Sequence, residues 1–213
     1  ATRDLVLFVL LTGKRIDEAS RLTWKNVNLT KGELILVKDT TKADSPEEIV
    51  PTTPYLHRLL KHRQENCKAR GNPYVFNADR KQDIKRKTHA RDTRSVMENI
   101  WQGIPEDERP RLTKEGSSYI MNHDLRRTYA TASLECGFSM EDKKALLGHK
   151  KDDMTDKYTQ RSTDYKRTQM KTVQEYLNAQ SHDGIHFMLV KFYGASEEHL
   201  HMAPDSEYKT INF

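Results

Sequence analysis

A small set of basic side chains and one tyrosine could carry out chemistry in this sequence. Arg15 follows a glycine turn, and His149 follows a second glycine. His123 and Arg126 lie three residues apart, so they share one face of a helix. Tyr158 comes nine residues after His149. Arginines bind phosphate oxygens, histidine exchanges protons near neutral pH, and an activated phenol is a nucleophile. The set therefore suits attack on a phosphodiester.

Each of these residues also has a structural explanation when it is taken alone. Arg15 can pair with Glu18, His123 can cap its helix, and Tyr158 can belong to the core. Other catalytic motifs are missing: the sequence holds no P-loop, no G-x-G-x-x-G, no G-x-S-x-G and no H-E-x-x-H. His182 and His186 are four residues apart, but the glycine between them weakens a helix. We therefore expect no metal site.

In this order, the residues resemble the tyrosine recombinases, the lambda-integrase-like family of site-specific DNA recombinases. Three motifs carry the resemblance: T-G-x-R-x-x-E at 12–18, H-x-L-R-x-T at 123–128, and L-G-H at 147–149 with a tyrosine nine residues later. Thr41-Lys42 fits the lysine of the family's hairpin. The resemblance covers roughly Leu5 to Tyr176. We expect a catalytic domain alone, without the DNA-clamping domain that precedes it in the family.

The resemblance implies a role for each residue of the set. Arg15 and Arg126 would bind the non-bridging oxygens of the phosphate under attack. His123 would accept the proton of the nucleophile, and His149 would hydrogen-bond the phosphate. Tyr158 would attack and form a phosphotyrosyl bond to the DNA 3′ end, releasing a 5′-hydroxyl.

The leaving oxygen needs a proton, which a lysine on the hairpin can supply. We expect Lys42 to do so, and Lys38 is the rival because the hairpin tip is longer than in compact members of the family. Glu18 would orient Arg15 rather than touch DNA, while Arg127 would either contact phosphate or simply be exposed. The phosphotyrosyl bond keeps the bond energy and arginines stabilise the charge, so the resemblance implies neither ATP, nor a metal, nor another cofactor.

The leading hypothesis is a recombinase or integrase of a mobile genetic element such as a prophage. A type IB topoisomerase uses similar residues, but the compact spacing from L-G-H to Tyr158 favours an integrase. A non-catalytic DNA-binding module is the third alternative, although every signature position holds a competent residue. The resemblance implies four protomers on two double-stranded DNA sites, with accessory DNA-bending proteins. It also implies a cytoplasmic protein that joins the nucleoid when it binds DNA.

The charge of the chain is concentrated in one place. The sequence has 36 Lys and Arg against 31 Asp and Glu, a net charge of +5. Residues 80–94, the basic segment, hold seven basic and two acidic residues, so they alone account for +5. Such a face suits a polyanion, although a solvated helix face explains it equally well. Within it we expect five residues to bind DNA: Lys85, Arg86, Lys87, Arg91 and Arg94.

Helices are expected to hold most of these residues. Apolar spacing predicts helices over residues 4–11 and from 15, which meet at the Gly13 turn, and over 54–66, 123–135 and 139–147. Further helices are expected as one long basic region bearing Ile84 and Trp101, and after a Thr163 cap. Tyr129, Tyr165 and Tyr176 are expected to be packing residues. Residues 103–118 read as a loop.

Strands are fewer. Residues 33–38 and 48–50 predict a hairpin with a long polar tip, and 74–76 a short buried piece. Residues 185–193 are β-prone and would pair with a neighbouring protomer or fold back on their own sheet. The fold class is therefore mainly α with a small antiparallel β-sheet (α+β), a helical fold like the tyrosine recombinase catalytic domain.

Length and composition predict one globular domain with an appendage. The chain has 213 residues, of which 35% are hydrophobic, and no run approaches a membrane span. We assign residues 1–181 to the catalytic domain and 182–213 to a C-terminal extension. The two cysteines exclude a disulfide framework, and the apolar run near the N-terminus lacks the flanks of a signal peptide. Because the chain begins at Ala1, we expect a fragment or a processed form.

Overall fold

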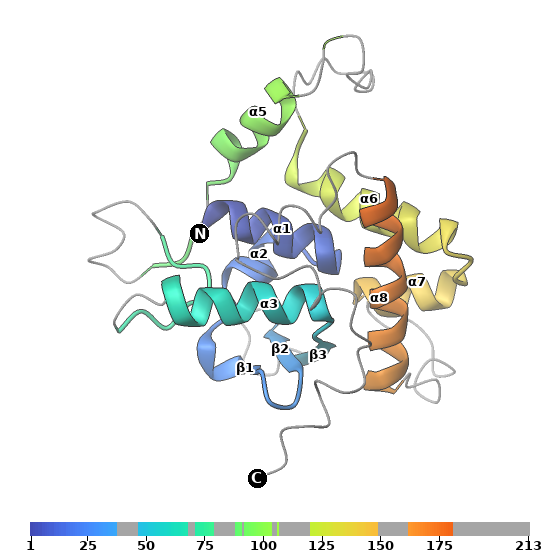
Figure 1. Cartoon of the computed structure of the whole chain (residues 1–213), viewed down its shortest axis with the longest axis horizontal. Coiled ribbons are helices and arrows are strands. Elements are labelled where there is room, and N and C mark those ends of the chain that lie inside the picture. The colour runs from blue at the N-terminus through green and yellow to red at the C-terminus, as the bar shows by residue number, and fades with distance from the viewer. Residues whose placement is uncertain are drawn as a thin grey trace.

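The computed structural model describes most of the chain before residue 181. The described residues are 1–37, 47–67, 71–78, 88–90, 92–103, 106, 120–148 and 162–180. Their helices are α1 (Thr2–Thr12), α2 (Ile16–Ser20), α3 (Pro54–His62), α5 (Arg94–Gly103), α6 (Asn122–Glu135), α7 (Met140–Leu147) and α8 (Thr163–Gln180). A short 3-10 helix spans Trp24–Asn26, and a π-helical turn, Arg63–Cys67, continues α3. One three-stranded sheet completes the fold (Figure 1).

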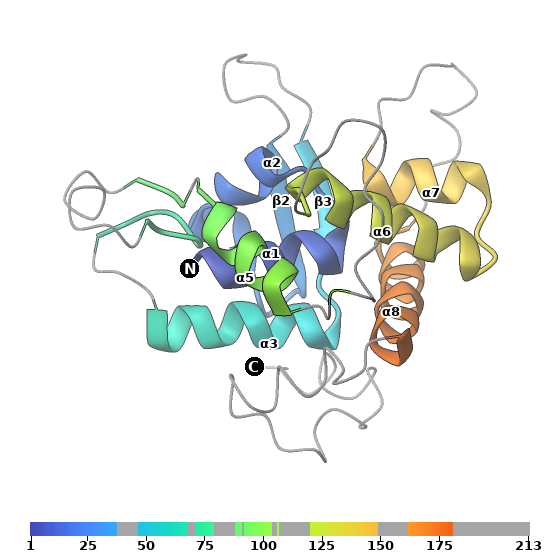
Figure 2. The same ribbon diagram turned by 90° about the horizontal axis from the view of Figure 1, so that it is seen from above.

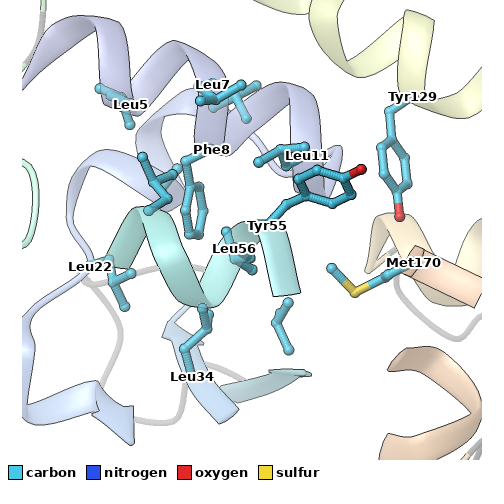
Figure 3. Close-up of a cluster of buried hydrophobic side chains, with 14 of the residues drawn as sticks. Leu5, Leu7, Phe8, Leu11, Leu22, Leu34, Tyr55, Leu56, Tyr129 and Met170 are labelled. Carbon is cyan, nitrogen blue, oxygen red and sulfur yellow. The ribbon is translucent and has the colours of Figure 1, made fainter. Parts of the chain in front are cut away.

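Helix α1 is the centre of this arrangement. It is apolar around most of its circumference, and Leu5, Phe8 and Leu11 are fully buried. Helices α2, α3, α5, α6 and α8 all contact it. Its side chains meet Leu56 of α3 and Tyr129 of α6 in the main core (Figure 3). Figure 2 shows α3 running alongside α1, with α6, α7 and α8 gathered at the end of α1 that leads into Gly13.

The sheet is antiparallel in the order β1 (Val27–Asn28), β2 (Glu33–Val37) and β3 (Glu47–Pro51). Leu34 pairs with Val50 and Leu36 pairs with Glu48, so these four side chains share one face of the sheet. All four are buried. The predicted hairpin strands and the α+β class with a small antiparallel sheet are confirmed. Strand β1 was not predicted, because two residues are too few to show an alternation.

Most helix ends lie where local signals put them. Thr53 caps α3, with its Oγ1 accepting a hydrogen bond from the Leu56 backbone N at 3.4 Å. Ser139 caps α7 in the same way, 3.1 Å from the Asp142 N. Helix α8 differs by one residue: the Tyr165 N donates to Ser162 Oγ at 3.1 Å, so Ser162 caps the helix and Thr163 is its first residue.

The prediction of one long basic helix from Ile84 to Trp101 is wrong, because α5 begins only at Arg94. Upstream of it, the described residues 88–90 pair with residues 76–78 instead of forming a helix. The Ala90 N donates to the Phe76 O at 2.7 Å, and the Ala78 N donates to the Thr88 O at 3.0 Å. This pairing with the predicted buried piece at 74–76 satisfies backbone groups that a helix would otherwise use.

Of the three tyrosines expected to pack, two do so. Tyr129 is fully buried, and Tyr176 packs partly buried against the core. Burial raises the pKa of Tyr129 far above its usual value, which leaves it a poor nucleophile. Tyr165 is 43% exposed, so its assignment as a packing residue is wrong. It lies in the first turn of α8, and its hydroxyl donates to Asp142 Oδ1 of α7 at 3.5 Å.

Several predicted features lie outside the described residues: the hairpin tip, most of the 103–118 loop, much of the basic segment, and the 185–193 strand. Within the described part of the chain, no helix is both long enough and apolar enough to cross a membrane.

Gly13 is expected to tolerate no side chain. Its φ is +64°, and an added Cβ would lie 2.5 Å from Cδ1 of Tyr129. Gly13→Ala should therefore lower the free energy of unfolding by roughly 2–5 kcal/mol, the sum of left-handed strain and overpacking. Gly137→Ala isolates the strain, because Gly137 has φ +79° and open space around it. Urea unfolding measures both. Equal losses would show that Tyr129 does not restrict this position.

Candidate active site

Arg15 and Glu18 form one side of the candidate site, at the turn between α1 and α2. Arg15 Nη1 lies 3.2 Å from Glu18 Oε1, and the Arg15 backbone N donates to Glu18 Oε2 at 3.2 Å. Glu18 is buried, while the Arg15 side chain is 56% exposed. The buried carboxylate thus holds both the backbone and the guanidinium of Arg15, and the guanidinium remains open to solvent.

Arg126 joins this turn to the end of α7. Its Nη1 donates to the Gly13 O at 2.6 Å, and its Nη2 donates to the Leu147 O at 3.0 Å. The residue is only 6% exposed. Burial lowers the pKa of Arg126, and the positive charge of Arg15 lowers it further. The two arginines of the predicted set therefore lie close enough for the charge of Arg15 to act on Arg126.

Lys14, between Gly13 and Arg15, is a further member of the site that the sequence analysis missed. Its Nζ donates to Glu48 Oε1 on β3 at 2.6 Å and to the Leu146 O at the end of α7 at 2.6 Å. Both side chains of the ion pair are buried. Burial lowers the pKa of Lys14, and the Glu48 charge opposes that shift. The signal for this pair in the sequence was the place of Glu48 on its strand, where the alternation of side chains puts it on the face turned toward the core.

Glu48 also contacts the glycine of the L-G-H motif. Gly148 ends α7 with φ +67°, and an added Cβ there would lie 2.0 Å from Glu48 Oε2. Glycine at this position is therefore required by the backbone conformation and by the carboxylate beside it. Gly148 is the last described residue before His149.

His123 lies in the first turn of α6, exposed and one turn before Arg126 on the same helix. Asp124 accepts a hydrogen bond from the Met121 N at 2.9 Å, so its carboxylate caps the first turn of the helix. Arg127 is exposed and pairs with Asp124 at 3.4 Å. An exposed side chain fits both predictions for Arg127, contact with phosphate and plain exposure, so both stay predictions.

The remaining predicted site residues are not described. Lys42, its rival Lys38, His149 and Tyr158 all lie outside the described residues. In the basic segment, the same holds for Lys85, Arg86, Lys87 and Arg91, whereas Arg94 is described. Arg94 is exposed and pairs with Asp92 at 3.1 Å. Among the described residues, no three His, Cys, Asp or Glu side chains converge as metal ligands.

Comparison with known proteins gives consistent matches. Residues 1–164 match the sequence profile of the Phage integrase family. The tyrosine recombinase XerS of Streptococcus uberis is 29% identical over 159 residues, which make up 74% of this chain and 41% of XerS. The chain thus spans less than half the length of that relative.

Two solved structures share the fold. The integrase of mycobacterium phage Brujita has a TM-score of 0.51 at 16% identity, covering 81% of this chain and 51% of that chain. The Tn1549 transposon integrase, in complex with a circular intermediate DNA, has a TM-score of 0.52 at 17% identity, covering 79% and 57%. At these identities the likeness concerns the fold, which agrees with the predicted catalytic-domain-like class.

The Lys14–Glu48 pair gives a testable stability prediction. Lys14→Met should cost about 3–5 kcal/mol of unfolding free energy, because it leaves a buried carboxylate without its ammonium partner. Lys14→Met/Glu48→Met should cost less than that single variant, because no buried charge remains. Lys171→Met is the matched control, because it removes a 3.7 Å pair with Glu175 on the surface of α8. That change should cost roughly 0–1 kcal/mol. The two side chains are not coupled if the double variant loses as much unfolding free energy in urea as Lys14→Met and Glu48→Met lose together.

Proposed function

The chain belongs to the phage integrase family, and from this we propose that it is the catalytic part of a site-specific DNA recombinase. The observation that carries the proposal is the arginine pair. Arg126 is fixed on the Gly13 and Leu147 carbonyls, and Arg15 leaves the same turn toward solvent. Each bond of Arg126 uses one of the five N–H groups of a guanidinium, so donors remain for phosphate oxygens. Both arginines stay charged at any working pH.

The proposed reaction is an exchange of phosphate esters. The Tyr158 oxygen attacks phosphorus, the bond to the 5′ oxygen breaks, and a phosphotyrosyl bond to the DNA 3′ end remains. His123 takes the phenol proton, His149 hydrogen-bonds the phosphate, and Lys42 protonates the leaving 5′ oxygen. Arg15 and Arg126 stabilise the charge that develops on the non-bridging oxygens. Attack by the 5′ oxygen of a second strand reverses the step, so no nucleotide is consumed.

The wider assembly belongs to the same proposal. Residues 1–181 would form the catalytic domain and residues 182–213 an extension. Four protomers would act on two double-stranded DNA sites, with accessory DNA-bending proteins and within the nucleoid. A DNA complex of the Tn1549 transposon integrase supports DNA as the substrate class. The basic segment would add phosphate contacts through its five predicted residues, of which Arg94 has an exposed side chain.

A type IB topoisomerase is not favoured, because the relatives named above are recombinases and integrases. A DNA-binding module without activity is separated from an enzyme by one question, which is whether the protein becomes covalently attached to DNA.

Tyr158→Phe should abolish that attachment while leaving DNA affinity intact. The change removes the attacking oxygen but keeps the ring, and phosphate affinity comes from the cations. The full-length gene product is incubated with a nicked suicide duplex built from the recombination site in the DNA that flanks the gene. Denaturing electrophoresis then detects the adduct. Tyr165→Phe is the matched control, because its exposed phenol lies outside the proposed chemistry.

Tyr165→Phe should form as much adduct as the unmutated protein. An adduct formed by Tyr158→Phe would disprove the assignment of the nucleophile. No adduct from the unmutated protein on its own mapped site would disprove the proposed function. The adduct should also persist after exhaustive chelation, since arginines carry the charge.

Lys42→Ala should slow cleavage of an ordinary phosphodiester far more than cleavage at a 5′-bridging phosphorothiolate. Sulfur leaves without a proton, so the loss of a general acid matters less there. Lys38→Ala is measured in parallel on both substrates. Preferential recovery by Lys38→Ala, without recovery by Lys42→Ala, would transfer the role to Lys38.

A further inference from the structure

Arg126 and Lys14 form a double clamp between the α1–α2 turn and the end of α7. On one side the clamp uses two consecutive residues, because Arg126 binds the Gly13 carbonyl and Lys14 follows Gly13 directly. On the other side it binds two consecutive carbonyls, those of Leu146 and Leu147. Arg126 therefore ties the two turns together, and Lys14 makes a second connection, from the residue after Gly13 to the carbonyl before that of Leu147.

Lys14 adds a third element that Arg126 does not reach. Glu48 lies on β3, opposite Leu36 of β2, so its backbone belongs to the hairpin. Its carboxylate accepts a hydrogen bond from the Lys14 ammonium at 2.6 Å. It also lies against Gly148, where a Cβ would come within 2.0 Å of Oε2. The hairpin is thus attached to both turns through one carboxylate.

Stability alone is a weak reason for such a pair. Two buried charges lose their hydration, and apolar side chains of similar volume often stabilise a fold equally well. The pair does, however, fix the direction and distance of β3 relative to the end of α7, whereas apolar contacts would let it shift. An ammonium held by one carboxylate and one carbonyl allows little sliding of β3 along the α7 end.

We propose that Lys14 and Glu48 are positioning residues, which hold β3 at a fixed distance from the two arginines. The inference rests on the proposed function, because it assigns the proton-donating lysine to the segment that joins β2 to β3. Neither side chain touches the substrate. Their contribution is to bring that lysine to the leaving oxygen while Arg15 and Arg126 hold the phosphate.

The test uses the full-length Lys14→Met/Glu48→Met variant on the suicide duplex, with either an ordinary phosphate or a 5′-bridging phosphorothiolate. Adduct formation on the ordinary phosphate should slow by roughly 10- to 100-fold, the effect of a misplacement of about 1 Å. The phosphorothiolate should recover most of this loss, because its leaving group requires no proton. DNA affinity and the cooperativity of unfolding should match those of the unmutated protein.

Matched variants make the outcome specific. Glu48→Gln keeps an oxygen that accepts from Lys14 but leaves the buried ammonium without a countercharge, so its rates are compared at equal folded fraction. Its slowing on the ordinary phosphate should then be smaller than that of the double variant, and sulfur should recover it in the same way. Lys171→Met breaks an exposed pair on α8 and should change neither rate. A merely structural role would slow both substrates equally, in proportion to the unfolded fraction. Equal slowing, or no slowing, of the double variant on the two substrates overturns the inference.

Other measurements test the proposed function separately from the positioning role. The adduct of the unmutated protein, and its absence in Tyr158→Phe, decide whether the chain is a recombinase. Lys42→Ala and Lys38→Ala decide whether the segment that joins β2 to β3 carries the proton donor. If neither lysine variant recovers on the phosphorothiolate while the adduct still forms, the recombinase assignment stands and the positioning role fails.

Discussion

The site depends on two cations that bind the carbonyl oxygens of neighbouring turns. The last carbonyls of a helix have no partner within the helix, and the negative end of its dipole favours positive charge there. At the end of α7, Lys14 and Arg126 meet both needs, because they bind the Leu146 and Leu147 oxygens. The same Arg126 binds the Gly13 oxygen on the opposite turn. Elements far apart in sequence are therefore joined where the T-G-x-R-x-x-E and L-G-H motifs lie.

Close packing makes these bonds possible, and α1 supplies it. Gly13 lets the ring of Tyr129 approach the backbone, and Gly148 lets the Glu48 carboxylate do so. Gln174 of α8 donates to the Leu11 O at 2.6 Å, which fixes the end of α1 just before Gly13. At the other end, Asp4 binds the buried Arg63, whose Nε donates to the Val75 O at 2.8 Å. Buried polar bonds therefore anchor α1 at both ends, and the apolar core fills the space between them.

The sequence predicted those features that are decided locally. Thr53 and Ser139 predict helix starts, and Gly13 and Gly148 predict helix ends, because each acts on backbone groups within a few residues. It failed where distant groups decide. The start of α5 depends on pairing between residues 76–78 and 88–90, which no helical periodicity reveals. Lys14 and Glu48 are 34 residues apart and belong to types that usually lie on the surface, so only the fold shows them as partners.

In the described site the positive charges outnumber the negative charges, and the excess lies toward solvent. Three cations, Lys14, Arg15 and Arg126, lie with two carboxylates, Glu18 and Glu48, and Lys166 adds a further positive charge near Lys14. Lys14 and Arg126 are buried, whereas Arg15 is more than half exposed. The surplus charge therefore meets solvent at Arg15, where water screens it, and an anion bound there also gains attraction from Arg126 behind it, which is buried and less screened. Under the proposed function that anion is the DNA phosphate, whose negative charge in the transition state balances what the two carboxylates leave unpaired.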